Sequence, residues 1–120
     1  MASDPVNEYF RRFYPADAAE AWEADWCGGS IWRRYTGNRS ATIFPPMVCK
    51  DGFSMSVQGH FGAYSMPRDD FAKRYSSVEV FELSEPETLI DDGIQSPAGY
   101  VPVDVVAQVI AKHGGLVDDE

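Results

Sequence analysis

The sequence predicts an α+β fold in which an antiparallel sheet packs against a C-terminal helix. The Asp51-Gly52 pair lies between two runs of strand-forming residues, which is typical of a β-hairpin over about residues 43–59. A further strand-like run follows at residues 77–83, and apolar residues between about 102 and 113 recur at helical spacing. Strands with helices segregated to one side are typical of the α+β class.

The chain length of 120 residues fits one domain, because a chain of this size can bury about two thirds of its unfolded surface. We therefore expect residues 1–120 to form a single domain. Within it, residues 41–115 are predicted to be the α+β core, and residues 1–40 a helical layer added at the N-terminus.

Two helices are predicted in the N-terminal layer. Asp4 and Pro5 have the order of an N-cap residue and a first helical residue, and apolar side chains then recur at helical spacing as far as Phe13. A second helix is expected over residues 16–26, because two glycines follow it. Residues 31–35 fit a one-turn helix and a strand about equally well.

The hairpin is expected to turn through a two-residue type I′ loop, which Asp-Gly pairs favour. This loop places Lys50 opposite Phe53 and Val48 opposite Met55. It also predicts that Val48, Phe53, Met55 and Val57 share the core face, because side chains alternate along a strand. The opposite, polar face would then carry Ser54, Ser56 and Gln58.

The strand at residues 77–83 has an apolar pattern that changes parity. Val78 and Val80 point to one side, whereas Phe81 and Leu83 point to the other. Either a bulge lies near Val80, or both faces of the strand are covered.

The C-terminal helix follows a loop-rich, acidic segment at residues 84–102. It is expected to begin near Pro102 and to end at Gly114-Gly115, and His113 is favourably placed at the negative end of the helix dipole. Residues 116–120 are expected to be a frayed acidic tail. The predicted inward stripe is Val103, Val106, Ala107 and Ile110, flanked by Val105 and Val109.

The net charge of −9 is unevenly distributed along the chain. Residues 1–30 carry −4, residues 31–77 carry +4 and residues 78–120 carry −9. Such segregation favours a protein that docks on a partner surface, because opposed charges steer association and repel unsuitable partners. The acidic balance argues against duplex nucleic acid as the main ligand, since phosphate contacts need a basic face.

Six acids with no base among them lie within fourteen residues of the acidic segment and the strand before it. One interpretation is a solvated edge that serves solubility. The functional interpretation is a docking surface for a basic protein, including one that normally holds nucleic acid. The partner-binding residues predicted in this way are Glu79, Glu82, Glu85, Glu87, Asp91 and Asp92.

A second candidate site combines the polar face of the hairpin with upstream arginines. His60 has the same parity as the serines of that face, but the sequence marks neither the third group nor the oxyanion hole that Ser-His catalysis needs. Tryptophan beside arginines is able to stack a base and contact a phosphate. The predicted ligand-binding residues are Trp32, Arg33, Arg34, Arg39, Ser54, Ser56, Gln58 and His60.

No cofactor or metal site is predicted. Cys27 and Cys49 belong to no C-x-x-C pair, and neither histidine has a second potential ligand at a spacing that is typical of metal sites. The first residues lack the basic and apolar regions of a secretory signal, and no apolar run approaches the roughly 18 residues of a membrane span. We expect a cytoplasmic protein with two free thiols and no membrane partner.

Several segments between residues 43 and 115 resemble small, mostly uncharacterised proteins of phage and prophage accessory regions. These segments are PPMVCKDGFSMSVQ, YSMPR, YSSVEV and the closing run from Tyr100 through Lys112-His113-Gly114-Gly115. The resemblance implies a context in the cytoplasm of a host cell, where small acidic proteins often inhibit host defence, as anti-CRISPR proteins do. Such inhibitors bind their targets and sometimes imitate nucleic acid.

Three functional hypotheses follow, and none of them is an enzyme. The first is a non-enzymatic, acidic inhibitor, anti-CRISPR-like in kind, that docks on a basic, nucleic-acid-binding host complex such as a CRISPR effector. The second is a protein that sequesters a small ligand such as a nucleotide messenger, and the third is a structural or assembly protein of the virion. A homodimer is compatible with each of them.

Overall fold

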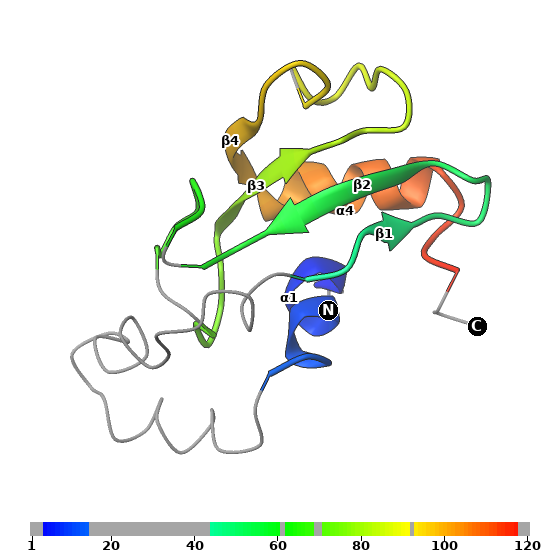
Figure 1. The fold of residues 1–120 in the computed structure, drawn as a ribbon. Helices are drawn as coiled ribbons and strands as arrows, with labels where there is room; N and C mark the ends of the chain where they lie inside the picture. Colours follow the sequence, from blue (N-terminus) through cyan, green and yellow to red (C-terminus); the bar gives the residue numbers. More distant parts are fainter. Residues whose placement is uncertain (1–3, 15–43, 61, 69–70, 92, 118–120) are drawn as a thin grey trace.

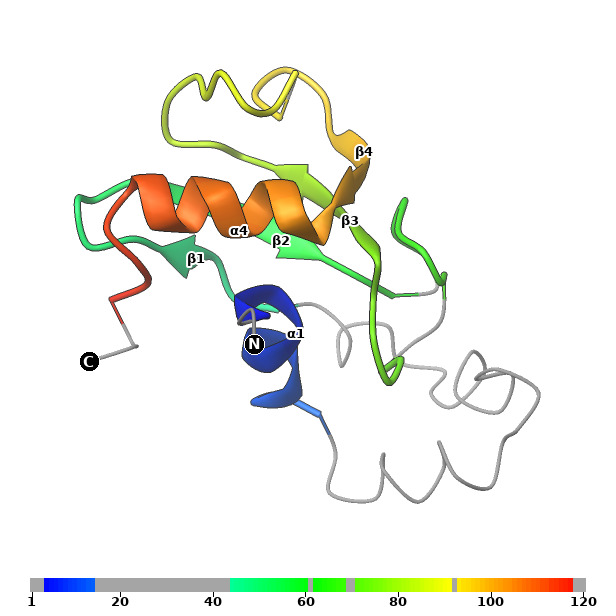
Figure 2. The same ribbon diagram turned by 180° about the vertical axis from the view of Figure 1, so that it is seen from behind.

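The structure, a computed structural model, describes residues 4–14, 44–60, 62–68, 71–91 and 93–117. Its four antiparallel strands lie in the order β1-β2-β3-β4, with α4 across one face of the sheet and α1 at one end (Figures 1 and 2). The α+β class is thereby confirmed. The helices and strands are α1 (Pro5–Arg11), β1 (Met47–Val48), β2 (Ser54–Gln58), β3 (Ser77–Phe81), β4 (Ala98–Pro102) and α4 (Val103–Lys112).

Helix α1 begins as its sequence predicts. The carboxylate of Asp4 accepts a hydrogen bond from the backbone N–H of Asn7 at 3.2 Å, and Pro5 occupies the first turn, where its missing N–H is not needed. Its inward residue Phe10 is fully buried and stacks on Phe44 with ring centroids 4.2 Å apart. The helices predicted at 16–26 and 31–35 lie outside the described residues.

No described helix has the length and apolar character needed to cross a membrane.

Two buried side-chain amides join segments that are far apart in the sequence. Asn7 donates to the backbone oxygen of Tyr75 at 3.0 Å and accepts from its N–H at 2.7 Å. Gln58 pairs in the same way with both backbone groups of Phe44, each at 2.8 Å. Each amide therefore satisfies a buried backbone donor and acceptor as a neighbouring strand would. Gln58, predicted on the open polar face, is buried for this reason.

The predicted register of the hairpin is wrong by one residue. The loop contains three residues, because Gly52 N–H donates to Cys49 O at 2.9 Å and Cys49 N–H donates to Phe53 O at 2.7 Å. Within this loop only Gly52 adopts a positive φ, at 99°, whereas a type I′ turn would also require one at Asp51.

The altered register exchanges the two faces of β1. Met47 pairs with Met55, and Val48 pairs with Ser54. Val48 is therefore 40% exposed on the polar face, while Met47 and Cys49 are buried. In the observed register the core contains Met47 and Cys49, whereas the predicted register would have placed Val48 there in their stead. The additional buried apolar surface favours the three-residue loop.

Helix α4 covers the sheet as predicted. Val103, Val106, Val109 and Ile110 are buried against the core face, whereas Ala107 is only partly buried. The stripe thus passes through Val109 and not through Ala107. The residues of the sheet that share this core are Met47, Met55, Val57, Val78, Val80 and Val101.

The residues that follow α4 are not a frayed tail throughout. Leu116 is 2% exposed and forms a bridge with Cys49, and the backbone N–H of Val117 donates to Val48 O at 2.9 Å. This short segment pairs with the outer edge of β1, and its apolar side chain joins the core. Residues 118–120 lie outside the described residues.

Strand β4 lies within the segment that the sequence predicts to be loop. Val101 pairs with Val78 and Ala98 with Val80, so β4 holds one more residue than β3 between these pairs. This bulge contains Tyr100, whose φ is 55°. A left-handed conformation costs about 1–2 kcal/mol for a residue other than glycine.

The change in parity that the sequence shows along residues 77–83 also has a local cause. Glu82, just after β3, has a φ of 55°, and the next residue, Leu83, is buried.

Candidate functional site

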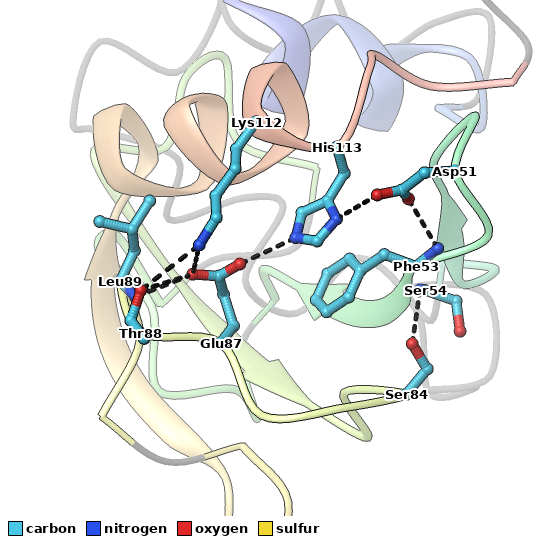
Figure 3. Close-up of polar contacts among 9 residues, drawn as sticks. All are labelled: Asp51, Phe53, Ser54, Ser84, Glu87, Thr88, Leu89, Lys112 and His113. Carbon is cyan, nitrogen blue, oxygen red and sulfur yellow. Dashed lines mark hydrogen bonds and ion pairs between the residues drawn. The ribbon is translucent and has the colours of Figure 1, made fainter.

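A highly connected polar cluster surrounds His113, the residue that caps the C-terminus of α4. Its Nδ1 lies 2.6 Å from Asp51 Oδ2 in the hairpin loop, and its Nε2 lies 2.8 Å from Glu87 Oε1 in the loop between β3 and β4 (Figure 3). An imidazole with a carboxylate on each nitrogen donates from both, and so carries a positive charge. We call this group, together with Lys112, the His113 clasp.

Glu87 is the buried centre of the clasp. It is 5% exposed, and its second oxygen, Oε2, accepts hydrogen bonds from Lys112 Nζ at 3.0 Å and from the backbone N–H of Leu89 at 2.9 Å (Figure 3). The ring of His113 stacks on Phe53 with centroids 4.2 Å apart and planes inclined by 13°. The buried carboxylate is thus matched by two cations and a backbone donor, as its burial requires.

The pKa values of the clasp shift in opposite directions. Burial raises the pKa of Glu87, but hydrogen bonds from Leu89, His113 and Lys112 outweigh it and lower that pKa from 4.5 to about 2. Hydrogen bonds to Glu87 and then to Asp51 raise the pKa of His113 above 6.5. The pKa of Asp51 is lowered, first by the hydrogen bond from Phe53 N–H and then by His113. The charged forms of all three side chains therefore stabilise one another.

These shifts predict how stability depends on pH. A raised histidine pKa contributes stability that is complete below pH 6.5 and is lost as the pH rises through the pKa of the folded state. The lowered pKa of Glu87 contributes stability that is complete above pH 4.5 and is lost as the pH falls toward about 2. The clasp therefore stabilises the fold most strongly between pH 4.5 and 6.5.

We expect the difference in free energy of unfolding between the wild type and His113→Gln to be largest near pH 6 and to shrink as the pH rises. Urea denaturation from pH 6 upward measures the difference. An NMR titration of His113 should give a pKa above 6.5. A constant difference between the two proteins over the whole range would contradict the role of the clasp.

The clasp also fixes the loop between β3 and β4, residues 82–97. Leu83, Glu87 and Ile90 point inward and are buried. Ser84 adds a second attachment, because its N–H donates to Ser54 O at 2.9 Å and its hydroxyl oxygen accepts from Ser54 N–H at 3.0 Å. The loop therefore presents Glu82, Glu85, Leu89, Asp91 and Ile94 to solvent in a defined arrangement.

Three carboxylates of this loop form what we call the acidic surface. Glu82, Glu85 and Asp91 are exposed, and within the described part of the chain none of them makes an ion pair. In both views the loop lies on the β3–β4 side of the sheet, whereas α1 lies on the β1 side (Figures 1 and 2). The cationic side chains described at the α1 end are Arg11, Arg12, Lys73 and Arg74.

The other predicted acidic residues lie elsewhere. Glu79 is half-buried on β3, where it pairs with Gln58 on the sheet face turned away from α4. Glu87 is buried in the clasp and is not available on the surface. Asp92 lies outside the described residues. Three of the six predicted side chains are thus brought together on one exposed loop.

The residues predicted to bind a small ligand are only partly brought together. Ser54 and Ser56 are half-buried on the polar face of β2, where Ser56 accepts a hydrogen bond from Gln58 at 3.0 Å. The amide of Gln58 is committed to Phe44, and His60 Nδ1 accepts from Gly62 N–H at 3.0 Å. Trp32, Arg33, Arg34 and Arg39 lie outside the described residues.

Sequence reasoning did not predict the clasp. His113 is separated from Asp51 by 62 residues and from Glu87 by 26. The only local signal was a histidine at a helix C-terminus, which the helix dipole explains without any partner.

Within the described residues, no group of three or more histidine, cysteine, aspartate or glutamate side chains could hold a metal ion.

No protein-family model, characterised protein or solved structure matches this chain. The functional interpretation of the acidic surface and the clasp therefore depends on their geometry and charge.

Proposed function

We propose that this chain is a non-enzymatic inhibitor that docks on a basic, nucleic-acid-binding protein through its acidic surface. The observation that carries the proposal is the exposure of Glu82, Glu85 and Asp91 on a loop that the clasp holds in place. A preorganised loop loses little conformational entropy on binding, and unpaired carboxylates speed association with a positively charged partner.

Apolar side chains beside the carboxylates support a protein partner. Leu89 and Ile94 of the same loop are 41% and 46% exposed. A hollow of about 380 Å³ lies beside Ile94, with Leu83, Pro86 and Ile90 also in its lining. Protein interfaces combine an apolar centre with a polar rim in this manner. We propose a complex of a host defence system as the partner, which is the context that the sequence resemblance implies.

The proposal predicts that removing two charges from the loop weakens capture of the partner, whereas removing two charges elsewhere does not. The loop variant is Glu85→Gln with Asp91→Asn. The matched control is Glu8→Gln with Asp104→Asn, which makes the same chemical changes at exposed positions on α1 and α4. We expect the loop variant to recover about tenfold less partner from a bacterial lysate at low salt, because two charge-assisted contacts are lost.

The captured protein must also meet two conditions. It should have a basic surface, and added nucleic acid should compete for it, because both ligands would occupy the same face. Equal losses in the two double variants would indicate a nonspecific effect of net charge. Such equality, or the absence of any basic protein among those captured by the wild type, would overturn the proposal.

A further inference from the structure

Tyr100 combines a strained backbone with an exposed side chain. Its φ is 55°, yet 48% of its surface remains accessible to solvent. Backbone strain of this kind is concentrated at functional sites, and a bulge is a common means of redirecting a side chain.

The surroundings of Tyr100 hold the bulge in place. Its N–H donates to Tyr64 O at 2.9 Å, so the segment before β3 closes this part of the outer edge of β4. The rings of Tyr64 and Tyr100 lie 6.0 Å apart and are inclined by 38°. Glycine is required at Gly99, because a Cβ there would lie 2.9 Å from Tyr64 Cβ. The ring of Tyr100 is thus positioned by its neighbours although it is exposed.

A hollow of about 310 Å³ lies beside this ring. Tyr100 and Leu89 supply aromatic and aliphatic surface, Val105 of α4 adds to it, and Asp91 supplies an exposed carboxylate. The full lining is Leu89, Ile90, Asp91, Ala98, Gly99, Tyr100, Val101, Pro102 and Val105. The hollow therefore combines apolar walls, an aromatic ring and a negative charge.

We infer that this hollow is the docking site for an arginine side chain of the basic partner. The aliphatic stem of arginine would cover Leu89 and Val105, and its planar guanidinium would contact the ring of Tyr100 and pair with the carboxylate of Asp91. Arginine suits these three surfaces better than lysine, because its cation is planar, weakly hydrated and able to pair with both carboxylate oxygens. This inference rests on the proposed function and specifies the chemistry of the partner.

The test uses three short peptides and NMR spectra of the full chain. The probes are acetyl-Gly-Arg-Gly-amide, its lysine analogue and its citrulline analogue, which has the shape of arginine without the charge. The arginine peptide should shift the methyl signals of Leu89 and Val105 and the amide signal of Tyr100. The lysine peptide should bind several-fold more weakly, and the citrulline peptide should cause almost no shift.

Two variants separate binding from folding. Tyr100→Gly removes the ring and relieves the strain, so it should melt at the same temperature as the wild type or higher, yet bind the arginine peptide at least about fivefold more weakly. Asp91→Asn retains the shape of the loop and should weaken binding about tenfold. Glu85 is an exposed acid outside the lining of the hollow. The Glu85→Gln variant should therefore bind the arginine peptide with an affinity within about twofold of that of the wild type.

Several outcomes would overturn the inference. Equal shifts with arginine and citrulline would exclude recognition of the charge, and shifts spread over the acidic surface without the hollow would indicate nonspecific attraction. Wild-type self-association that Tyr100→Gly abolishes would identify a second copy as the occupant. If the arginine peptide did not bind at the hollow but the chain still captured a basic protein from the lysate, the proposed function would be unaffected. If the peptide bound but no basic protein was captured, the result would count against the proposed function alone.

Discussion

Replacing Glu87 by glutamine is expected to lower the free energy of unfolding by about 2–4 kcal/mol, since a buried carboxylate that joins two cations is then lost. Each carboxylate oxygen accepts at least one hydrogen bond, from His113 at Oε1 and from Lys112 and Leu89 at Oε2. Glutamine has only one acceptor oxygen. Its amide nitrogen would face one of these donors, so the variant fills the same space without satisfying the same groups.

Glu85→Gln is the matched control for this prediction. It makes the same chemical change at an exposed position two residues away on the same loop, and we expect an effect within about 0.5 kcal/mol. Urea denaturation at pH 6 measures both variants. A loss at Glu87 no larger than that at Glu85 would mean that the clasp does not stabilise the fold.

The Glu87 variant also separates stability from docking. If the clasp holds the acidic surface, Glu87→Gln should release residues 84–90 before the rest of the domain unfolds. Backbone amides that donate within the loop, such as Ile90 N–H to Glu87 O at 3.1 Å, should then exchange faster with solvent than those of β2 and β3. Uniform acceleration over the whole domain would instead indicate a purely global loss of stability.

Replacing Asn7 by alanine is expected to destabilise the fold by a similar amount, about 2–4 kcal/mol. The side chain is 1% exposed, and its amide is the partner of both the N–H and the oxygen of Tyr75. Alanine would leave these two buried backbone groups unsatisfied, which costs about 1–3 kcal/mol each. The effect is large because one buried side chain satisfies both backbone groups of Tyr75, in the segment that leads into β3.

Glu8→Ala is the control for Asn7, because it removes an exposed side chain from the next position of the same helix. We expect it to cost less than about 1 kcal/mol, which reflects helix-dipole effects alone. Urea denaturation gives both free energies, and hydrogen exchange of the Tyr75 amide reports the broken contact directly. Similar free energies for the two variants, with a protected Tyr75 amide, would show that the Asn7–Tyr75 pair contributes little.

Elements with local sequence signals were predicted well. Asp4 and Pro5 mark the start of α1, Pro102 and Gly114 bound α4, and residues 77–83 contain β3. Each signal depends on neighbouring residues, such as a cap, a proline or an alternation of side chains, and so it can be read without knowledge of the rest of the fold.

Features that depend on pairing between distant segments were missed. The Asp51-Gly52 pair allowed two loop lengths, and the core decided between them by burying Met47 and Cys49. The strand nature of β4 depends on its pairing with β3 and on a left-handed Tyr100, which no local propensity favours. Leu116 is ordered because it reaches the edge of β1.

The acidic region was predicted from composition, but composition did not show which of its carboxylates would be exposed and which would be buried. Sequence counts treated Glu85 and Glu87 alike, whereas one is exposed and the other is buried against His113. The difference arises because Lys112 and His113 reach this loop only after α4 has packed across the sheet.

By itself, the sequence determined the α+β class, both ends of the C-terminal helix and the excess of negative charge in the last third of the chain. Only the tertiary structure decided which carboxylates face solvent, which two join the clasp and how Tyr100 borders a hollow. The physical reason is that helix caps and side-chain alternation act between neighbours in the chain, whereas burial and ion pairing depend on residues that meet only when the chain is folded.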